Sequence, residues 1–194
     1  MTTLIGIGGS SRKGGNTDIL LDEALRGAAD TGAEVDRVHI ADLAIGRCLA
    51  CGGCAKTGVC VVKDDAPELL ERMWAADALL VSTPIYFMGP PSQLKALIDR
   101  GQSMWVRTFQ KTPPEERKKN RKPAGLIMIG GMNFGYMFDP TAIIVKAFYA
   151  SMGFKLTREL SYKKIDAPGA IRDHETAMSD AYDLGKSLAT ETQA

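Results

Sequence analysis

Short apolar runs and amphipathic stretches alternate along this chain from its first residues to its last. The strand candidates are apolar, or alternate between apolar and polar residues, and are bounded by polar or glycine-containing turns. They are Thr3–Gly8, Glu34–Ile40, Ala78–Ser82, Ala124–Ile129 and Lys155–Ser161. Ala78–Ser82 is almost entirely apolar, as is typical of a strand covered on both faces. The pattern therefore predicts five strands with a buried one among them.

Helical spacing of apolar residues is found between these strands. After the first strand, Ile19 to Ala28 follow this spacing, and Asn16 or Thr17 is available as the N-cap. The other helices are predicted over Pro67–Ala76, from near Pro91 (with Leu94, Leu97 and Ile98 on one face), over Thr141–Met152 and over Arg172–Leu188. Alternating strands and helices predict an α/β fold, a doubly wound parallel sheet with helices on both faces. No linker or internal repeat interrupts the pattern, so one domain is expected over residues 1–194.

Composition excludes several classes of partner. The 194 residues carry 24 basic and 23 acidic side chains, a net charge of +1, which gives no basic field for nucleic acid or for a membrane surface. The longest apolar stretches fall far short of the ~20 residues of a membrane helix. No charged segment precedes the apolar start at Leu4, so we expect no signal peptide and a cytoplasmic protein.

One segment departs from the alternation. The residues KTPPEERKKNRK at 111–122 carry six basic and two acidic groups, within an excursion that we place at 108–122. A solvated connection between helix and strand is the simpler interpretation. The alternative is a contact for a phosphorylated cofactor or partner.

The glycine-rich loop, residues 9–17 with the sequence GSSRKGGNT, joins the first strand directly to a helix. Backbone N–H groups, the positive end of the helix and hydroxyl groups would converge there on an anion. A nucleotide P-loop would need Lys and Ser or Thr after Gly14, where Gly15 and Asn16 stand, and a dinucleotide fingerprint would need glycine at Ser11. The loop favours a terminal monophosphate, and an ordinary turn with an N-cap is the alternative.

The aromatic loop, residues 82–91 with the sequence STPIYFMGPP, follows the third strand. In a sheet of order 2-1-3-4-5, ligands bind outside the carboxyl ends of the strands, between strands 1 and 3. Tyr86, Phe87 and Met88 could line a flat heteroaromatic ring there, with Gly89 allowing close backbone approach. A core or interface role is the alternative. Gly130-Gly131, after the fourth strand, would meet the outer edge of the ring.

All four cysteines fall within the cysteine loop, which we place at residues 46–62 and expect at the same sheet edge. Cys48, Cys51, Cys54 and Cys60 have the spacing C-x2-C-x2-C-x5-C. Disulfides are disfavoured by this crowding and by the lack of a secretory signal, and common zinc sites separate two C-x2-C pairs by a longer arm. The spacing resembles ferredoxin-type ligation of a [4Fe–4S] cluster. Zinc, redox-active thiols and a vestigial site remain the alternatives.

Taken together, these motifs resemble the iron–sulfur flavoproteins of the NADPH-dependent FMN reductase group, which are flavodoxin-like. The resemblance rests on residues 9–17, on the cysteine loop with the VVKDD that follows Cys60, and on TPIYFMGPPSQLKALIDR at 83–100. It covers residues 3 to about 105 and is more generic beyond. Met132 to Tyr136 depart from the polar, often acidic segment that the family carries after the two glycines.

The resemblance implies a set of cofactor contacts. The FMN phosphate would be held by Ser10, Arg12, Gly15, Asn16 and Thr17, the isoalloxazine ring by Pro84, Ile85, Tyr86, Phe87, Met88 and Gly89 with Gly130 and Gly131, and the [4Fe–4S] cluster by Cys48, Cys51, Cys54 and Cys60. It also implies a homodimer or homotetramer that brings the cluster of one subunit near the flavin of another.

The expected function is electron transfer between a one-electron partner, such as a ferredoxin-like protein, and a two-electron donor or acceptor, with NAD(P)H as a possible donor. No side chain need act as a base, and His39 and His174 are expected to be structural. Asp64 and Asp65 are interpreted as charges that suit the N-terminus of the next helix. An NAD(P)H-dependent flavin or quinone reductase without a functional cluster, and a non-enzymatic flavodoxin-like binding module, are the alternatives.

Overall fold

A computed structural model describes residues 1–119 and 121–191, apart from the side chains of residues 118 and 119. Asn120, which belongs to the predicted basic excursion, and residues 192–194 at the end of the predicted domain lie outside the described residues.

The centre of the molecule is a five-stranded parallel sheet in the order β2-β1-β3-β4-β5. The strands are β1 (Thr3–Gly8), β2 (Glu34–His39), β3 (Ala78–Pro84), β4 (Lys122–Gly130) and β5 (Phe154–Lys163). The predicted fold class and strand order are confirmed. All five strands lie where the sequence predicts them, and β1 has the predicted bounds.

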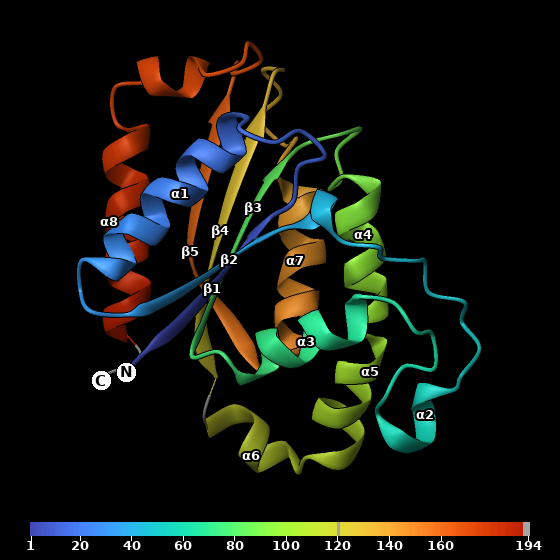
Figure 1. The fold of residues 1–194 in the computed structure, drawn as a ribbon. Coiled ribbons are helices and arrows are strands. Elements are labelled where there is room, and N and C mark those ends of the chain that lie inside the picture. Colours follow the sequence, from blue (N-terminus) through green and yellow to red (C-terminus); the bar gives the residue numbers. More distant parts are fainter. Residues whose placement is uncertain (120, 192–194) are drawn as a thin grey trace.

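Helices cover both faces of this sheet (Figure 1). One face carries α1 (Asn16–Ala29) and α8 (Ala177–Glu191), and the other carries α3 (Ala66–Ala75), α4 (Ser92–Arg100) and α7 (Asp139–Ser151). Each face has its own apolar cluster, one centred on residues such as Leu20 and Leu80, the other on residues such as Val81 and Leu126. The inner strands β1, β3 and β4 are buried from both sides, which explains their continuous apolar sequences.

Two glycines set the distance between α1 and α8. An added Cβ at Gly185 would lie 1.7 Å from the carbonyl oxygen of Ala24, and one at Gly27 would lie 2.1 Å from that of Tyr182. Neither position has room for a side chain. The two helices therefore pack backbone against backbone, and α1, which begins at the glycine-rich loop, is held tightly at its far end.

Several short helices were not predicted. They are α2 (Cys54–Thr57), α5 (Gln102–Trp105), a π-helix (Val106–Lys111) and α6 (Pro114–Lys119). The predicted basic excursion is thus helical over most of its described length, although most of its described side chains are exposed. At the other end, the last helix begins at Ala177 and not at Arg172, because Ala170–Asp173 forms a separate 3-10 turn. His174 lies between the two, with its ring edge-on to Tyr162.

No helix in the described part of the chain is long and apolar enough to cross a membrane.

Candidate functional site

The glycine-rich loop ends at Gly15, which is the N-cap of α1. The prediction that Asn16 or Thr17 is the N-cap was wrong, because the helix already begins at Asn16. No side chain caps this helix, so the N–H groups of its first turn face the loop without a side-chain acceptor. Ser10 is buried, and its hydroxyl accepts a hydrogen bond from the N–H of Arg12 at 3.0 Å. Gly14 has φ +67°, and nothing lies within 4 Å of where its Cβ would be. The loop is an open, N–H-rich turn.

A buried carboxylate lies under this turn. Asp18 is 1% exposed, and its Oδ2 accepts hydrogen bonds from the N–H of Gly14 at 2.8 Å and from Nε2 of His39 at 3.1 Å. Nδ1 of His39 accepts from the N–H of Ala41 at 3.2 Å, which assigns the ring proton to Nε2. Oδ1 of Asp18 is buried without a partner. Asp18 and His39 therefore join the loop to the end of β2.

The side chain of Asn16 is directed away from the loop. Its amide nitrogen donates to the carbonyl of Ala167 at 2.9 Å, and its amide oxygen accepts from the N–H of Ile171 at 3.3 Å. What Asn16 offers an anion is thus its backbone N–H. Thr17 is buried, and its carbonyl accepts from the hydroxyl of Ser82 at the end of β3. The glycine-rich and aromatic loops accordingly share one edge of the sheet, as predicted.

The aromatic loop contains a tight, strained turn. Tyr86 and Gly89 exchange two backbone hydrogen bonds of 2.9 Å each. The residues between them, Phe87 (φ +48°) and Met88 (φ +66°), are both in the left-handed region. That conformation costs a non-glycine residue roughly 1–2 kcal/mol. The carbonyl of Met88 accepts from the hydroxyl of Thr141 on α7. The fully exposed side chain of Phe87 is presented at some cost in stability, which is typical of functional sites.

We expect Phe87→Asn to raise the free energy of unfolding of the flavin-free protein by about 1 kcal/mol, because Asn tolerates the left-handed region far better than Phe. No buried surface is lost, since Phe87 is fully exposed. Urea denaturation measures the change. Tyr86→Asn, a neighbour outside the left-handed region, should bring no gain, and equal or lower stability of Phe87→Asn would contradict the strain argument.

An apolar cavity of about 440 Å³ opens beside this turn. It is lined by Ile85, Phe87, Met88, Gly130, Gly131, Met132, Phe134 and Met137. The structure thus brings the aromatic loop and Gly130-Gly131 together, as predicted. Sequence reasoning did not include Met132, Phe134 or Met137, because it read the segment after the two glycines only as a departure from the family pattern. The aromatic and sulfur-containing residues of this segment could have indicated an apolar wall for a flat ring.

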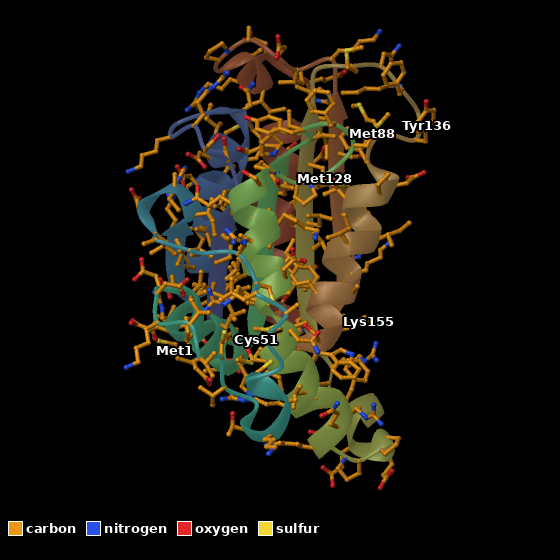
Figure 2. The ribbon with its side chains drawn as sticks, turned by 90° about the vertical axis from the view of Figure 1, so that its right-hand side faces the viewer. Met1, Cys51, Met88, Met128, Tyr136 and Lys155 are labelled. Atoms are coloured by element: carbon orange, nitrogen blue, oxygen red, sulfur yellow. The ribbon has the colours of Figure 1, made fainter. Side chains whose placement is uncertain are left out.

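The cysteine loop lies elsewhere. Figure 1 shows it leaving the carboxyl edge of the sheet after β2 and running beside α4 to α2, at the opposite end of the molecule. In Figure 2, Cys51 lies in the lower half of the molecule, and Met88 and Tyr136 lie in its upper part. The prediction that the cysteines share the sheet edge of the other two loops was wrong. The aromatic loop precedes α4 and the cysteines lie at its C-terminal end, so the length of that helix, about 13 Å, separates them.

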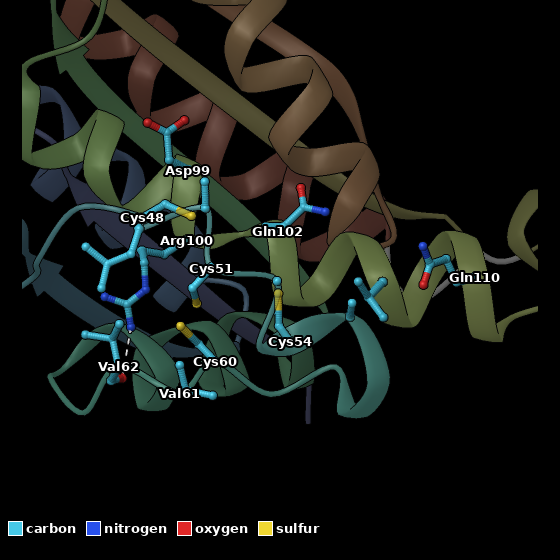
Figure 3. A pocket seen from close by; sticks show the side chains of 15 residues that line it. Cys48, Cys51, Cys54, Cys60, Val61, Val62, Asp99, Arg100, Gln102 and Gln110 are labelled. Carbon is cyan, nitrogen blue, oxygen red and sulfur yellow. Dashed lines mark hydrogen bonds between the residues drawn. The ribbon is translucent and has the colours of Figure 1, made fainter.

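All four cysteines line one cavity, again of about 440 Å³ (Figure 3). Its other walls come from the loop itself, from the end of α4 and from the residues that follow, among them Arg100, Gln102 and Val106. The four thiols are free; Cys51 is exposed and the others are half-buried. Burial, and then the neighbouring thiols of Cys60, Cys48 and Cys51, raise the pKa of Cys54. The four thiols therefore share one partly buried environment.

The base of the cysteine loop is fastened by Asp64 and Asp65. Asp64 accepts from the N–H groups of Gly46 and Ala66 and forms an ion pair with Arg100, while Asp65 accepts from the N–H of Ala44. Burial acts to raise the pKa of Asp64, but the hydrogen bonds from Arg100, Gly46 and Ala66 outweigh it and hold the pKa below its ordinary value. The interpretation of both aspartates as simple helix N-terminal charges was incomplete, because they close the loop.

The arrangement of the thiols bears on which metal group they could hold. Among residues 1–119 and 121–191, no three His, Cys, Asp or Glu side chains are gathered tightly enough to hold one metal ion. A single zinc ion needs its sulfur ligands about 3.8 Å apart, from tetrahedral geometry with Zn–S of about 2.3 Å. In the part of the chain that the structure describes, the four thiols thus line one cavity without forming a single-ion site.

The sheet order and the cofactor-sized cavity at its carboxyl edge define a flavodoxin-like protein. The family model of the NADPH-dependent FMN reductases matches residues 2–143. The chain belongs to this family of FMN-dependent oxidoreductases, in the group whose members are named iron–sulfur flavoproteins. The predicted family and the predicted class of enzyme are confirmed.

Individual relatives agree with this assignment. The chain is 40% identical to an iron–sulfur flavoprotein of Methanocaldococcus jannaschii over 202 residues, which cover 96% of this chain and 95% of the relative. It is 38% identical to an iron–sulfur flavoprotein of Methanosarcina thermophila over 132 residues, 68% of this chain and 65% of the relative. The solved structure of a flavone reductase superposes with a TM-score of 0.73 at 22% identity, covering 99% of this chain and 63% of that one. The last likeness concerns the fold alone.

Proposed function

We propose that this protein is an iron–sulfur flavoprotein that carries electrons between a one-electron partner and a two-electron partner through a [4Fe–4S] cluster and FMN. The observation that carries the proposal is that Cys48, Cys51, Cys54 and Cys60 all line one cavity, in a chain whose sheet edge has a second cavity suited to a flavin ring. The names of the relatives support both groups.

The residues at the sheet edge fit FMN. Its phosphate would lie against the uncapped start of α1, with Ser10, Arg12 and the N–H groups of residues 15–17 around it. Its ring would lie in the apolar cavity between the aromatic loop and Gly130-Gly131, with Phe87, Met88 and Phe134 against it.

The cysteine cavity fits a [4Fe–4S] cluster by the chemistry of its donors, since four thiols are the ligand set of such clusters. Ala50 (φ +50°), Gly52 (φ +70°) and Gly58 (φ +74°) adopt left-handed conformations that fold the loop around the cavity. Gly52 lines the cavity, and nothing lies within 4 Å of where its Cβ would be.

When bound, FMN supplies the exchange of electrons one at a time or in pairs, and a [4Fe–4S] cluster supplies the exchange of one electron at a time. Two one-electron transfers to or from a ferredoxin-like protein would balance one two-electron transfer with the other partner, such as NAD(P)H or a quinone. The chain would supply position, and this chemistry requires no side chain to act as a base. His39 fits this, since its ring is buried and bonded to Asp18 and Ala41.

We further propose a homodimer or homotetramer. The two cavities lie at opposite ends of α4, and an assembly that brings the cysteine cavity of one chain near the apolar cavity of another would shorten the path between them. Exposed apolar side chains are available for such a contact around both cavities. They are Leu49, Val59 and Val61 at the first and Phe87, Met132, Phe134 and Tyr136 at the second.

Anaerobic stopped-flow reduction distinguishes the proposal from the second candidate, an NAD(P)H-dependent FMN or quinone reductase, which the family name favours. We expect the flavin to be reduced rapidly by a reduced ferredoxin in the protein with its full iron content. Rapid reduction by NADPH that is unaffected by removal of the iron would favour the reductase. A protein that retains no flavin at all would favour a binding module.

We expect Asp18→Ala to weaken FMN binding roughly tenfold and to leave riboflavin binding unchanged. The N–H of Gly14 loses its buried acceptor, which is worth about 1.5–3 kcal/mol, and the loop that faces the phosphate loosens. Flavin fluorescence of the apoprotein measures both affinities. Asp22→Ala, four residues along α1 and exposed, is the matched control, and Asp18→Asn should recover part of the loss. An equal loss for FMN and riboflavin would contradict the proposed position of the phosphate.

A further inference from the structure

Arg100, the last residue of α4, joins both ends of the cysteine loop. Its side chain is completely buried. One terminal nitrogen donates to the carbonyl of Gly46 at 3.2 Å and to Oδ2 of Asp64 at 2.6 Å. The other donates to the carbonyl of Val62 at 3.1 Å and to Oδ1 of Asp64 at 3.0 Å. Gly46 and Val62 are the first and last residues of the loop, so one guanidinium group closes it.

This closure matters because the loop has little other support. Apart from the four-residue helix α2, the loop contains no regular structure, and several of its residues are exposed. Bringing the ends of such a loop together costs conformational entropy. The bidentate pair of Arg100 with Asp64, whose carboxylate also accepts from the N–H of Gly46, offsets that cost with charge-assisted hydrogen bonds.

The fifth donor of Arg100 has no partner that meets hydrogen-bond geometry. Its Nε is buried. Figure 3 shows the guanidinium group beside Cys60. Burial acts to lower the pKa of Arg100, but the hydrogen bonds to Asp64 act against burial, and the pKa is raised. A thiol is a weak acceptor, whereas a thiolate that binds metal carries the charge that a guanidinium N–H prefers.

We propose that Arg100 is a positioning residue of the metal centre, which closes the cysteine loop and donates its free Nε–H to the sulfur of Cys60. The proposal rests on the proposed function, since it requires a cluster on the four cysteines. Hydrogen bonds to the sulfur atoms and nearby positive charge stabilise the reduced, more negative form of a cluster. Arg100 therefore raises the reduction potential of the cluster.

The test compares Arg100→Lys with Asp64→Asn and Arg107→Met. Lysine keeps the positive charge of Arg100 but lacks Nε and the two terminal nitrogens that bind Asp64 together. Asp64→Asn weakens the closure of the loop but leaves Nε of Arg100 in place. Arg107 packs over Gly58 of the same loop, but its guanidinium is held by Glu71, which makes it the matched control. We expect Arg100→Lys to make cluster reduction about tenfold less favourable, a lowering of about 59 mV for one electron. Asp64→Asn should not lower the potential, and Arg107→Met, whose charge is paired with Glu71, should lower it by clearly less than Arg100→Lys does.

Tryptic cleavage of the iron-free proteins within the cysteine loop gives a second readout that needs no cluster. We expect cleavage at Lys56 to be roughly tenfold faster in Arg100→Lys than in Arg107→Met, because loop opening exposes the bond. The proposal would be overturned if Arg100→Lys and Arg107→Met were cleaved at equal rates, or if the reduction potential of Arg100→Lys were unchanged. It would also be overturned if Asp64→Asn lowered the reduction potential as much as Arg100→Lys does. If Arg100→Lys holds no iron, the cleavage rates alone decide. A wild-type protein without iron and sulfide would instead overturn the proposed function.

Discussion

Cys51→Ser is expected to lower the iron and acid-labile sulfide of the anaerobically purified protein from about four of each per chain to below about one. Cys51 is an exposed thiol at the mouth of the cysteine cavity, and a serine hydroxyl is a poor ligand for iron compared with a thiolate. FMN content should not change, because the flavin contacts lie at the other end of α4. Iron, sulfide and flavin assays on one preparation measure all three quantities.

Ala55→Ser is the matched control for this variant. It introduces the same hydroxymethyl group into the lining of the same cavity without removing a thiol, and we expect it to keep its iron. Full iron content in Cys51→Ser would remove this residue from the ligand set. Joint loss of iron and FMN would mean that the two cavities are not independent.

The second large effect concerns stability. We expect Gly185→Ala to lower the free energy of unfolding by about 3 kcal/mol, because the added methyl group would lie 1.7 Å from the carbonyl oxygen of Ala24. Relief requires α8 to move away from α1, since a backbone atom and not a flexible side chain occupies the space. Urea denaturation of the apoprotein measures the change.

Gly135→Ala is the control for the same chemical change. Nothing lies within 4 Å of a Cβ at Gly135, so we expect a change within about 0.5 kcal/mol of wild type. If Gly185→Ala unfolds with the stability of the wild type, the two helices do not pack backbone against backbone as described.

Local pattern was sufficient to predict the sheet. A strand covered on both faces is mostly apolar, and β1, β3 and β4 are apolar except for a few residues near their ends. The predicted ends of the strands were less accurate, because the end of a strand depends on how far it pairs with the neighbouring strand. β5, for example, runs on to Lys163 since its ladder with β4 continues as far as Gly130. The helix α6 was missed because Pro113, Pro114 and the charged residues beside them indicate a solvated loop.

Local pattern likewise predicted only the part of the site that directly follows strands. The glycine-rich and aromatic loops directly follow strands, so sheet topology alone puts them at one edge. The cysteine loop is not fixed in this way. Its course depends on hydrogen bonds from Arg100 to residues as far as 54 positions away in sequence, and no local pattern reports such a contact. Met132, Phe134 and Met137 were overlooked because their role emerges only when the cavity is formed.

An anaerobic reductive titration of the purified protein, followed in the visible spectrum, shows whether one chain carries both a flavin and a cluster. A chain that holds both FMN and a [4Fe–4S] cluster should take up about three electrons, two on the flavin and one on the cluster. Uptake of about two electrons per FMN, with no change outside the flavin bands, would contradict the account, because the four cysteines would then hold no redox-active cluster.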